Sequence, residues 1–561
     1  MRHTSFLCRL AAAVLSCTLC CAGMPMPAAS AEETGDLPAK FDLRDIGAVT
    51  SVKLQAGGTC GAFSSIAAIE SNLIMQGMAD NTIDLSEEHL SWFANVQGTA
   101  EDPDDPLRKD RKNQDMDHFT DAVGYRDVIG LLSSRIGVVP ASMTPRYKDK
   151  EPLDESLRYE SIAHLRNAVR YDELDFSSIK KNLMEKGAMM LCYYNLHTLE
   201  SLYSERGSYY QNKVNYRDPI EGQENVSGGG HAVCLVGWDD NFPKEDFVIT
   251  PPGDGAWICK NSWGEKDSKT DNGYIYISYY DGSVHDIVQY EMVAPEDDYD
   301  GCYQYSCSLN ARISLTRHGG MFGNVYTAQK DENLTAVSTF FEAADFPYDI
   351  SLYALKDDYE NPCDGELLAQ LKGALPTAGY YTIPLDEVIQ VKKGTNFSIV
   401  FKIPIQEYCI FNTGPGKKGE RKVFYAIYSE GEPVVWKDPC AQGVISAVGS
   451  AFLKVFTTDG TVINEENFPD PESRSAAEAL DKNGDGILSE KEQAADEPFI
   501  RGDLNRDGKV NAVDLSLLKQ VLLGSQQTGL CLPAGDWNGD GDIGTEDAAG
   551  ILDFLLQKDA A

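Results

Sequence analysis

The chain is 561 residues long and has a formal net charge of -38, because 87 acidic residues outnumber 49 basic ones. This length predicts several domains, since single hydrophobic cores stop growing at about 250–300 residues. The negative charge repels phosphate backbones, so it argues against nucleic acid as a partner.

The first residues have the pattern of a secretory signal peptide. Basic residues precede an apolar run at 10–21, and the small residues at 29–31 supply a cleavage site, so residues 1–31 are predicted to be a signal peptide. A lipid-modified Cys17 is a weaker alternative. The apolar run is too short for a membrane anchor, and no later stretch is apolar enough to span a bilayer. The mature protein is therefore expected to be soluble outside the cytoplasm, with no membrane span.

A cysteine beside glycines opens the first helical pattern. Cys60 ends the run Gln55-Ala-Gly-Gly-Thr-Cys60, and apolar residues recur after it at helical spacing, which places Cys60 at a helix N-terminus. The helix dipole and a nearby imidazolium would both lower the pKa of its thiol, and the thiolate is the form that attacks a carbonyl carbon. A lone cysteine is more often a small buried hydrophobe. The prediction therefore depends on its partners.

Two later segments supply those partners. His231 follows a glycine run and begins an apolar run at 232–236 that is typical of a buried strand. Asn261 stands at the end of the next apolar run, where its amide could hold the imidazole in one orientation and tautomer, with Trp263 shielding the bond from water. Together with Cys60, these residues predict a nucleophilic Cys-His-Asn site.

An oxyanion hole is predicted beside the thiol. Gln55 precedes Cys60 by five positions, and its side-chain N–H could be donated to the developing oxyanion together with the backbone N–H of Cys60. Losing one such donor typically costs about 100 to 1,000-fold in rate.

In this order the segments resemble papain-like cysteine peptidases. The resemblance begins at Phe41-Asp-Leu-Arg-Asp45 and continues through 49–64 and 85–90; it resumes at 229–239, 257–264 and 273–277. It implies a two-lobed α+β domain over residues 38–295, with a helical lobe around Cys60 and a small β-barrel that carries His231 and Asn261. Protein or peptide substrates would lie extended in the cleft between the lobes.

Three features depart from the family's pattern. The family usually has Trp directly after the nucleophile, where this chain has Gly61, and the spacing from Gln55 to Cys60 is one residue shorter than usual. Gly61 would either loosen the packing around Cys60 or make room for a side chain from elsewhere. The third departure is the absence of a long inhibitory pro-segment before Phe41.

Short alternating apolar runs separated by turn residues follow from about residue 296. They predict an all-β sandwich over 296–460. The segment resembles the lectin-like β-sandwich that follows the peptidase domain in some secreted bacterial enzymes, although such a fold does not establish sugar binding. The sequence leaves open whether the ligand of this sandwich is a carbohydrate or a protein. Cys302 and Cys307 are close enough in sequence to form a disulfide.

A polar stretch at 461–478 is predicted to be a linker, and three calcium loops follow it within residues 479–561. Each loop places oxygen ligands at the spacing that wraps a Ca²⁺ ion, with glycine at position 6 for the sharp turn. The predicted metal ligands are Asp481, Asn483, Asp485, Ile487, Ser489 and Glu492; Asp503, Asn505, Asp507, Lys509, Asn511 and Asp514; and Asp536, Asn538, Asp540, Asp542 and Asp547.

The last two loops lead into the apolar helical patterns 515–524 and 548–556. They resemble the duplicated loop–helix repeats of type I dockerins, which bind cohesin modules of a cellulosome scaffold. The loop that ends in Glu492 is more like an ordinary EF-hand and is an extra for that family; whether it pairs with the repeats is left open. Calcium is expected to be needed for folding, because a segment so small and acidic has little core without its ions.

The sequence therefore predicts a multidomain protein: an α+β papain-like peptidase, an all-β sandwich and a small α calcium-binding dockerin/EF-hand module. The favoured function is that of a secreted cysteine endopeptidase docked on the cell-surface cellulosome of an anaerobic bacterium, with calcium in its loops and no cofactor for catalysis. The alternative is a catalytically silent binding or adhesion protein carried on the scaffold, for which Gly61 is the best support.

Overall fold

The computed structural model describes a defined part of the chain. The described residues are 37–95, 122–145, 152–197, 202–212, 227–305, 307, 309, 311–315, 319–403, 409–414, 423–428, 434–436, 450–481, 486–489, 501–502, 504, 509–510, 512–522, 532–535, 537 and 543–559. The predicted signal peptide lies outside them.

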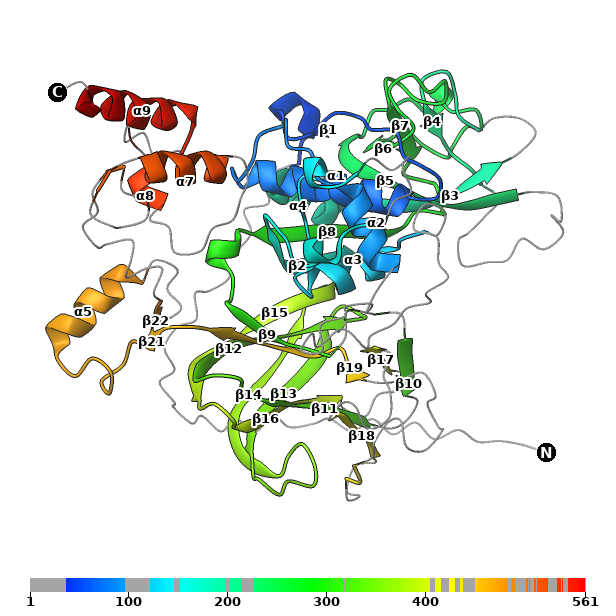
Figure 1. The fold of residues 1–561 in the computed structure, drawn as a ribbon. Coiled ribbons are helices and arrows are strands. Elements are labelled where there is room, and N and C mark those ends of the chain that lie inside the picture. Colours follow the sequence, from blue (N-terminus) through cyan, green and yellow to red (C-terminus); the bar gives the residue numbers. More distant parts are fainter. Residues whose placement is uncertain are drawn as a thin grey trace, which may run out of the picture. The chain divides into compact units, whose positions relative to one another are not determined.

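Three of the described helices, α1, α2 and α3, build the first lobe (Figure 1). Helix α1 (Cys60–Met75) is buried on almost every side, as expected for a helix made mainly of small and apolar residues. Helices α2 (Glu87–Asn95) and α3 (Tyr125–Leu132) pack in contact with it. This packing fixes the N-terminal end of α1, where Cys60 lies.

An antiparallel sheet covers the other side of α1. Its strands are β1 (Lys40–Asp42), β2 (His164–Tyr171), β3 (Met189–His197), β5 (Ser227–Asp239), β6 (Ala256–Lys260), β7 (Tyr274–Ser278) and β8 (His285–Val293), with β4 (Ser208–Tyr209) pairing parallel to β7. Helix α4 (Phe176–Lys186) connects β2 to β3. Strand β5 lies between β3 and β6, so the strands that carry His231 and lead to Asn261 are neighbours.

The predicted sandwich is present. One layer contains β9 (Gly301–Tyr303), β12 (Glu332–Phe341), β15 (Ala378–Val391) and β20 (Lys454–Thr458); the other contains β11 (Gly319–Thr327), β13 (Phe346–Leu355), β14 (Gly365–Leu375), β16 (Asn396–Ile403) and β18 (Val423–Tyr428). A small sheet adds β10 (Ala311–Leu315), β17 (Cys409–Gly414) and β19 (Ser450–Ala451). Aromatic side chains including Phe322, Phe341 and Phe397 fill the core between the layers. Cys302 is a free thiol, so it has no disulfide to Cys307.

The sheet that covers α1 and the first sandwich layer are one continuous sheet of twelve strands. Strand β15 pairs with β2, and Gly379 lies opposite Val169 at the junction. Glycine is required there, because Gly379 has φ +146° and a Cβ atom would lie 2.2 Å from the carbonyl oxygen of Ala168. The backbone hydrogen bonds of the sheet therefore join the two domains.

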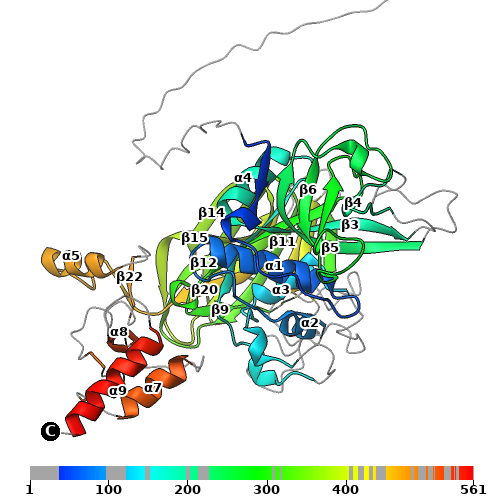
Figure 2. The same cartoon turned by 90° about the horizontal axis from the view of Figure 1, so that it is seen from above.

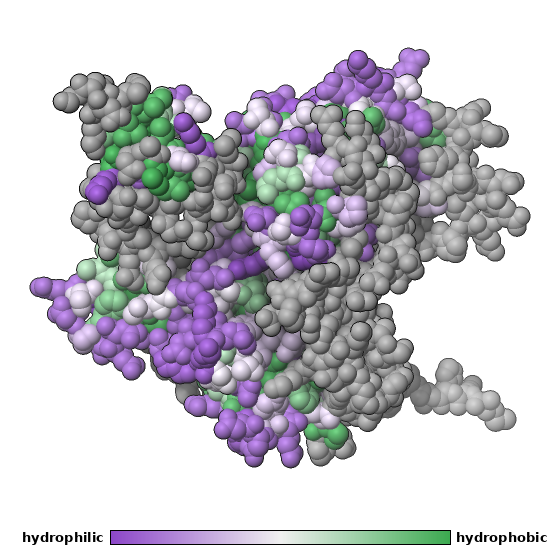
Figure 3. Space-filling view, in the orientation of Figure 1, coloured by the Kyte–Doolittle hydropathy of each residue, from purple (hydrophilic) through white to green (hydrophobic). Residues whose placement is uncertain are grey.

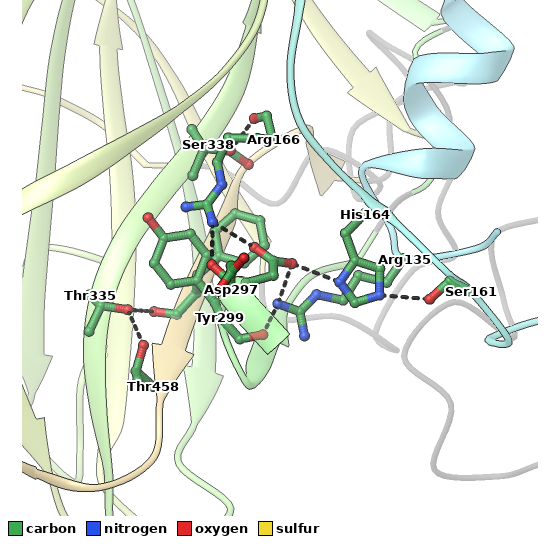
Figure 4. A network of polar contacts seen from close by, with 12 residues as sticks. Arg135, Ser161, His164, Arg166, Asp297, Tyr299, Thr335, Ser338 and Thr458 are labelled. Atoms are coloured by element: carbon green, nitrogen blue, oxygen red, sulfur yellow. Dashed lines mark hydrogen bonds and ion pairs between the residues drawn. The ribbon is translucent and has the colours of Figure 1, made fainter. Parts of the chain in front are cut away.

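A buried carboxylate adds a polar contact between the domains (Figure 4). Asp298 accepts hydrogen bonds from Arg135 at 3.0 Å and from His164 Nδ1 at 2.9 Å, and Arg166 lies 3.4 Å from its other oxygen. Burial raises the pKa of Asp298, but the hydrogen bond from His164 and the two guanidinium charges outweigh it and hold the pKa below its usual range. The segment that enters the sandwich is thus tied by charge to strand β2 and to the residues that follow α3.

The described residues of the predicted linker and of the first predicted calcium loop form a helix and a short strand pair. Helix α5 (Pro471–Leu480) occupies part of the predicted linker, capped by Asp470. Strand β21 (Thr461–Val462) pairs with β22 (Ile487–Leu488), which lies in the first predicted calcium loop. The strand of the extra loop therefore pairs with the segment that follows the sandwich.

Three further helices form a group of their own, α7 (Ala512–Leu522), α8 (Leu532–Gly535) and α9 (Thr545–Asp559) (Figure 2). Their small core contains Leu504, Val510, Leu518 and Ile551. Among the described helices, none is long and apolar enough to cross a membrane.

Candidate active site

Cys60 is the first residue of α1 and is half-buried against the strand that carries His231. Burial raises the pKa of its thiol, while backbone groups of Ala232, Gly61 and Cys60 itself lower it. The pKa is raised overall, which corrects the expectation of an acidic thiol. The sequence indicated the helix N-terminus but not that the surrounding chain would desolvate the sulfur.

His231 and Asn261 are joined by a hydrogen bond. His231 Nε2 lies 2.9 Å from Asn261 Oδ1, and because an amide oxygen only accepts, Nε2 carries the proton. Asn261 Oδ1 also accepts from the backbone N–H of Ser262 at 2.8 Å. Asn261 Nδ2 is buried without a hydrogen-bond partner among the described residues. The two donors therefore set the direction of the amide, and the amide sets the tautomer of the imidazole.

Gln55 is held by the residue that follows Asn261. Ser262 Oγ donates to Gln55 Oε1 at 2.6 Å, and the backbone N–H of Gln55 donates to the carbonyl of Ser262 at 2.8 Å. The side-chain Nε2 of Gln55 donates to the carbonyl of Gly57 at 2.9 Å, which leaves its second hydrogen for another acceptor. The structure thus links the candidate oxyanion donor to the loop of Asn261.

Trp263 covers the imidazole. Its ring is stacked on His231 with centroids 4.8 Å apart and an interplanar angle of 20°. Because His231 and Asn261 are both buried, their hydrogen bond is shielded from water, as the sequence predicted for this tryptophan.

The space beside Gly61 is filled by backbone from another segment. A Cβ atom at position 61 would lie 1.8 Å from the carbonyl oxygen of Val123 and 3.0 Å from its carbonyl carbon. Gly61 therefore makes room for main chain next to α3 and does not leave a void. The sequence suggested that the space could admit a side chain; the occupant is instead the peptide group.

A buried charge cluster lies beneath these residues and was missed by sequence reasoning. Glu70 is completely buried in α1 and accepts from Thr50 Oγ1 at 2.5 Å and from Lys53 Nζ at 3.1 Å. Lys260 Nζ, next to Asn261 in the chain, donates to the same Thr50 hydroxyl at 2.8 Å, and burial lowers the pKa of Lys260. The cluster ties the helix of Cys60 to the strand of Asn261. The sequence signal for this cluster was a charged residue inside an apolar pattern: Glu70 in the helix after Cys60 and Lys260 in the strand before Asn261.

The described parts of the three predicted calcium loops show how each loop closes. Asp481 Oδ2 accepts from the backbone N–H of Gly486 at 2.9 Å, Asp514 Oδ1 from that of Leu504 at 3.0 Å, and Asp547 Oδ1 from that of Trp537 at 2.8 Å. Asp514 and Asp547 are buried. Buried carboxylates aimed back at the start of their own loops fit a hard cation.

The other predicted calcium ligands do not form a metal-binding group within the described part of the chain. Ile487, Ser489 and Lys509 are described, but no group of three potential metal-binding side chains lies within the described residues. The remaining predicted ligands lie outside them: Asn483, Asp485, Glu492, Asp503, Asn505, Asp507, Asn511, Asp536, Asn538, Asp540 and Asp542.

Comparison with known families assigns a class to each part. Residues 37–94 and 135–294 match the papain family cysteine proteases, residues 302–411 match the lectin-like domain, and residues 501–556 match the type I dockerin domain. The chain therefore carries a papain family cysteine protease domain, followed by a lectin-like domain and a C-terminal type I dockerin.

Individual relatives agree with this class. The viral cathepsin of Heliothis zea nuclear polyhedrosis virus is 24% identical over 244 residues, which are 43% of this chain and 52% of that protein. The chain thus spans about half the length of this curated relative. Two structures of the clostridial cysteine protease Cwp84 each match 75% of this chain at 21% identity and a TM-score of 0.58. They are covered to 99% for the form after propeptide cleavage, and to 89% for the protease and lectin-like domains of this surface layer associated protein of Clostridium difficile. At this identity the likeness shows a shared fold.

Proposed function

We propose that this protein is a secreted cysteine endopeptidase that hydrolyses peptide bonds through Cys60, His231 and Asn261. The observation that carries the proposal is the oriented imidazole. His231 Nε2 donates a hydrogen bond to Asn261 Oδ1 at 2.9 Å. Ala232, which follows His231 in the chain, supplies a backbone hydrogen bond to the Cys60 sulfur. In this proposal the other ring nitrogen, Nδ1, exchanges a proton with the Cys60 thiol.

The chemistry follows from these positions. Burial raises the pKa of Cys60 and so opposes an isolated thiolate. The thiolate therefore forms by transfer of the thiol proton to His231, because the resulting imidazolium stabilises the sulfur anion. The sulfur attacks the peptide carbonyl carbon, and the oxyanion accepts hydrogen bonds from Gln55 Nε2 and the backbone N–H of Cys60. His231 then protonates the leaving amine, and with His231 as base a water molecule hydrolyses the thioester.

The alternative function, a silent peptidase fold used for binding, was supported mainly by Gly61. That support is weakened, because the backbone of Val123 fills the space that a side chain at position 61 would occupy. A missing tryptophan is thus compatible with a packed site.

Replacing Cys60 by alanine is expected to abolish peptide cleavage. The measurement is hydrolysis of a quenched casein between pH 5 and 8, with cleavage sites read by mass spectrometry. Cys363→Ala is the matched control, because Cys363 is another half-buried free thiol but lies in the sandwich, and it should keep wild-type activity. Absence of cleavage by the wild-type protein at every pH would favour the silent alternative.

We further propose that the dockerin attaches the enzyme to a cohesin module of a cellulosome scaffold on the surface of an anaerobic bacterium. Apolar side chains gather on the surface over α7 and α9 (Figure 3). Val513, Leu552 and Phe554 are among the exposed large hydrophobic residues, and an exposed apolar patch of this kind marks a protein interface. The residues that would hold calcium there are Asp514 and Asp547, and the ion would supply the charge that their buried carboxylates need.

Removal of calcium is expected to unfold this module while leaving the peptidase folded. Its core is small, so the binding energy of the ions contributes directly to folding. Cohesin affinity measured by calorimetry should fall by more than about tenfold after chelation or in Asp547→Ala, since loss of a supporting contact alone typically costs 10- to 100-fold in metal affinity. Glu472→Ala, which changes an exposed carboxylate of α5 outside α7 and α9, is the control. Unchanged cohesin binding in excess chelator would contradict the proposal.

A further inference from the structure

The imidazole of His231 belongs to a closed ring of aromatic contacts. Trp263 stacks on one face of His231, and Tyr193 meets its edge with centroids 5.6 Å apart at 71°. Tyr203 then contacts Trp263 edge-on, with centroids 5.7 Å apart at 74°. The ring is closed by a hydrogen bond of 2.5 Å between the hydroxyls of Tyr193 and Tyr203.

The members of this ring come from separate parts of the chain. Tyr193 lies on β3 directly opposite His231 on β5, Trp263 follows β6, and Tyr203 lies in the segment before β4. Tyr193 is completely buried and Tyr203 nearly so. Side-chain contacts link Tyr203 to Trp263 and to Tyr193 on β3.

A third tyrosine supports the pair from behind. The ring of Tyr209 lies 5.1 Å from that of Tyr193 and 4.8 Å from that of Tyr203, and its hydroxyl donates to the carbonyl of Tyr194 at 2.9 Å. Burial raises the pKa of Tyr193 and of Tyr203, so both hydroxyls stay protonated over the range in which a thiol peptidase works. The pair is therefore a neutral, fixed hydrogen bond.

We infer that the hydroxyl pair of Tyr193 and Tyr203 positions the imidazole of His231, an inference that rests on the proposed peptidase function. Tyr193 forms one wall of the imidazole pocket and Trp263 the other. The hydroxyl bond connects the walls through Tyr203, so it limits rotation of the imidazole away from Cys60 and Asn261. Tyr193 and Tyr203 are positioning residues, since neither is required to touch the substrate.

The test is Tyr203→Phe, which keeps the ring contacts and removes the hydroxyl. We expect kcat to fall about fivefold with little change in KM, because one hydrogen bond of ordinary net strength is lost from the positioning of the imidazole. The bell-shaped pH profile of kcat/KM should also become narrower, with its acidic limb moved to higher pH and its basic limb moved to lower pH. A loosely held imidazole stabilises the thiolate less, which raises the thiol pKa, and is itself stabilised less as the cation, which lowers the imidazolium pKa.

A second readout does not need turnover. The rate of iodoacetamide alkylation of Cys60 below pH 6 follows its thiolate fraction and should fall in Tyr203→Phe. Tyr193→Phe should reproduce both effects, and the double variant should be no worse than either single one, since both remove the same bond. Tyr210→Phe, a buried tyrosine of the same segment outside the ring, should match wild type.

The outcomes separate this inference from the proposed function. Wild-type rates and an unshifted pH profile in both Tyr203→Phe and Tyr193→Phe would overturn the inference while leaving the peptidase established. A rate that falls equally at every pH, with unchanged alkylation of Cys60, would also overturn it, because that pattern indicates a smaller folded fraction. Inactivity of the wild-type protein would instead remove the proposed function.

Discussion

Replacing Gly61 by alanine should destabilise the peptidase domain by about 2 kcal/mol or more, the usual range for overpacking a dense core. The added Cβ would lie 1.8 Å from the carbonyl oxygen of Val123, and a backbone group cannot rotate away as a side chain can. The better helix propensity of alanine offsets about 1 kcal/mol of this cost at most. Tryptophan, the residue that papain-like enzymes usually have here, should be tolerated even less.

The free energy of unfolding in urea is the measurement for this variant. Gly124→Ala is a matched control in the same contact region, because a Cβ there would meet only Asp127 Oδ2 at an ordinary 3.7 Å. It should change stability by less than about 1 kcal/mol, the typical effect of an altered helix cap. Equal stability of Gly61→Ala and wild type would show that the segment around Val123 is not seated against α1.

Replacing Asp298 by asparagine is expected to lower the free energy of unfolding by about 3 kcal/mol, because breaking a buried ion pair leaves the charges of its partners uncompensated. Arg135, Arg166 and His164 all approach this carboxylate, whose side chain is only 5% exposed. The loss should appear as separate unfolding of the peptidase and the sandwich in place of one joint transition, observed by calorimetry.

The pH dependence of this effect has a defined sign. The pKa of Asp298 is lowered in the folded protein, so its contribution is present above the unfolded pKa of about 3.9 and is lost as the pH falls through the lower folded value. The difference in the free energy of unfolding between Asp298→Asn and wild type should therefore be constant near neutral pH and shrink below about pH 4. Asp297→Asn, at the exposed neighbouring position, should show no such difference. A pH-independent difference would contradict this role of the charge.

Much of the architecture could be predicted from local pattern. The helix after Cys60, the strand after His231 and the alternating runs of the sandwich each depend on the periodicity of nearby side chains, which is visible in the sequence. The catalytic roles of Gln55, Cys60, His231 and Asn261 stay a prediction, as do the domain boundaries. The linker at 461–478 was read from polarity alone, which did not reveal that Pro471–Leu480 forms a capped helix.

The sequence by itself determined the class of each module, because residue types at fixed spacing carry that information: a cysteine, a histidine and an asparagine in order, and acidic loops with glycine at position 6. Tertiary structure alone decided what surrounds them. That the Val123 backbone fills the space at Gly61, that β15 extends the peptidase sheet, that Glu70 ties Thr50 to Lys53, and that burial raises the pKa of Cys60 all depend on contacts between distant segments. Packing and desolvation are properties of the assembled core, and no local pattern records them.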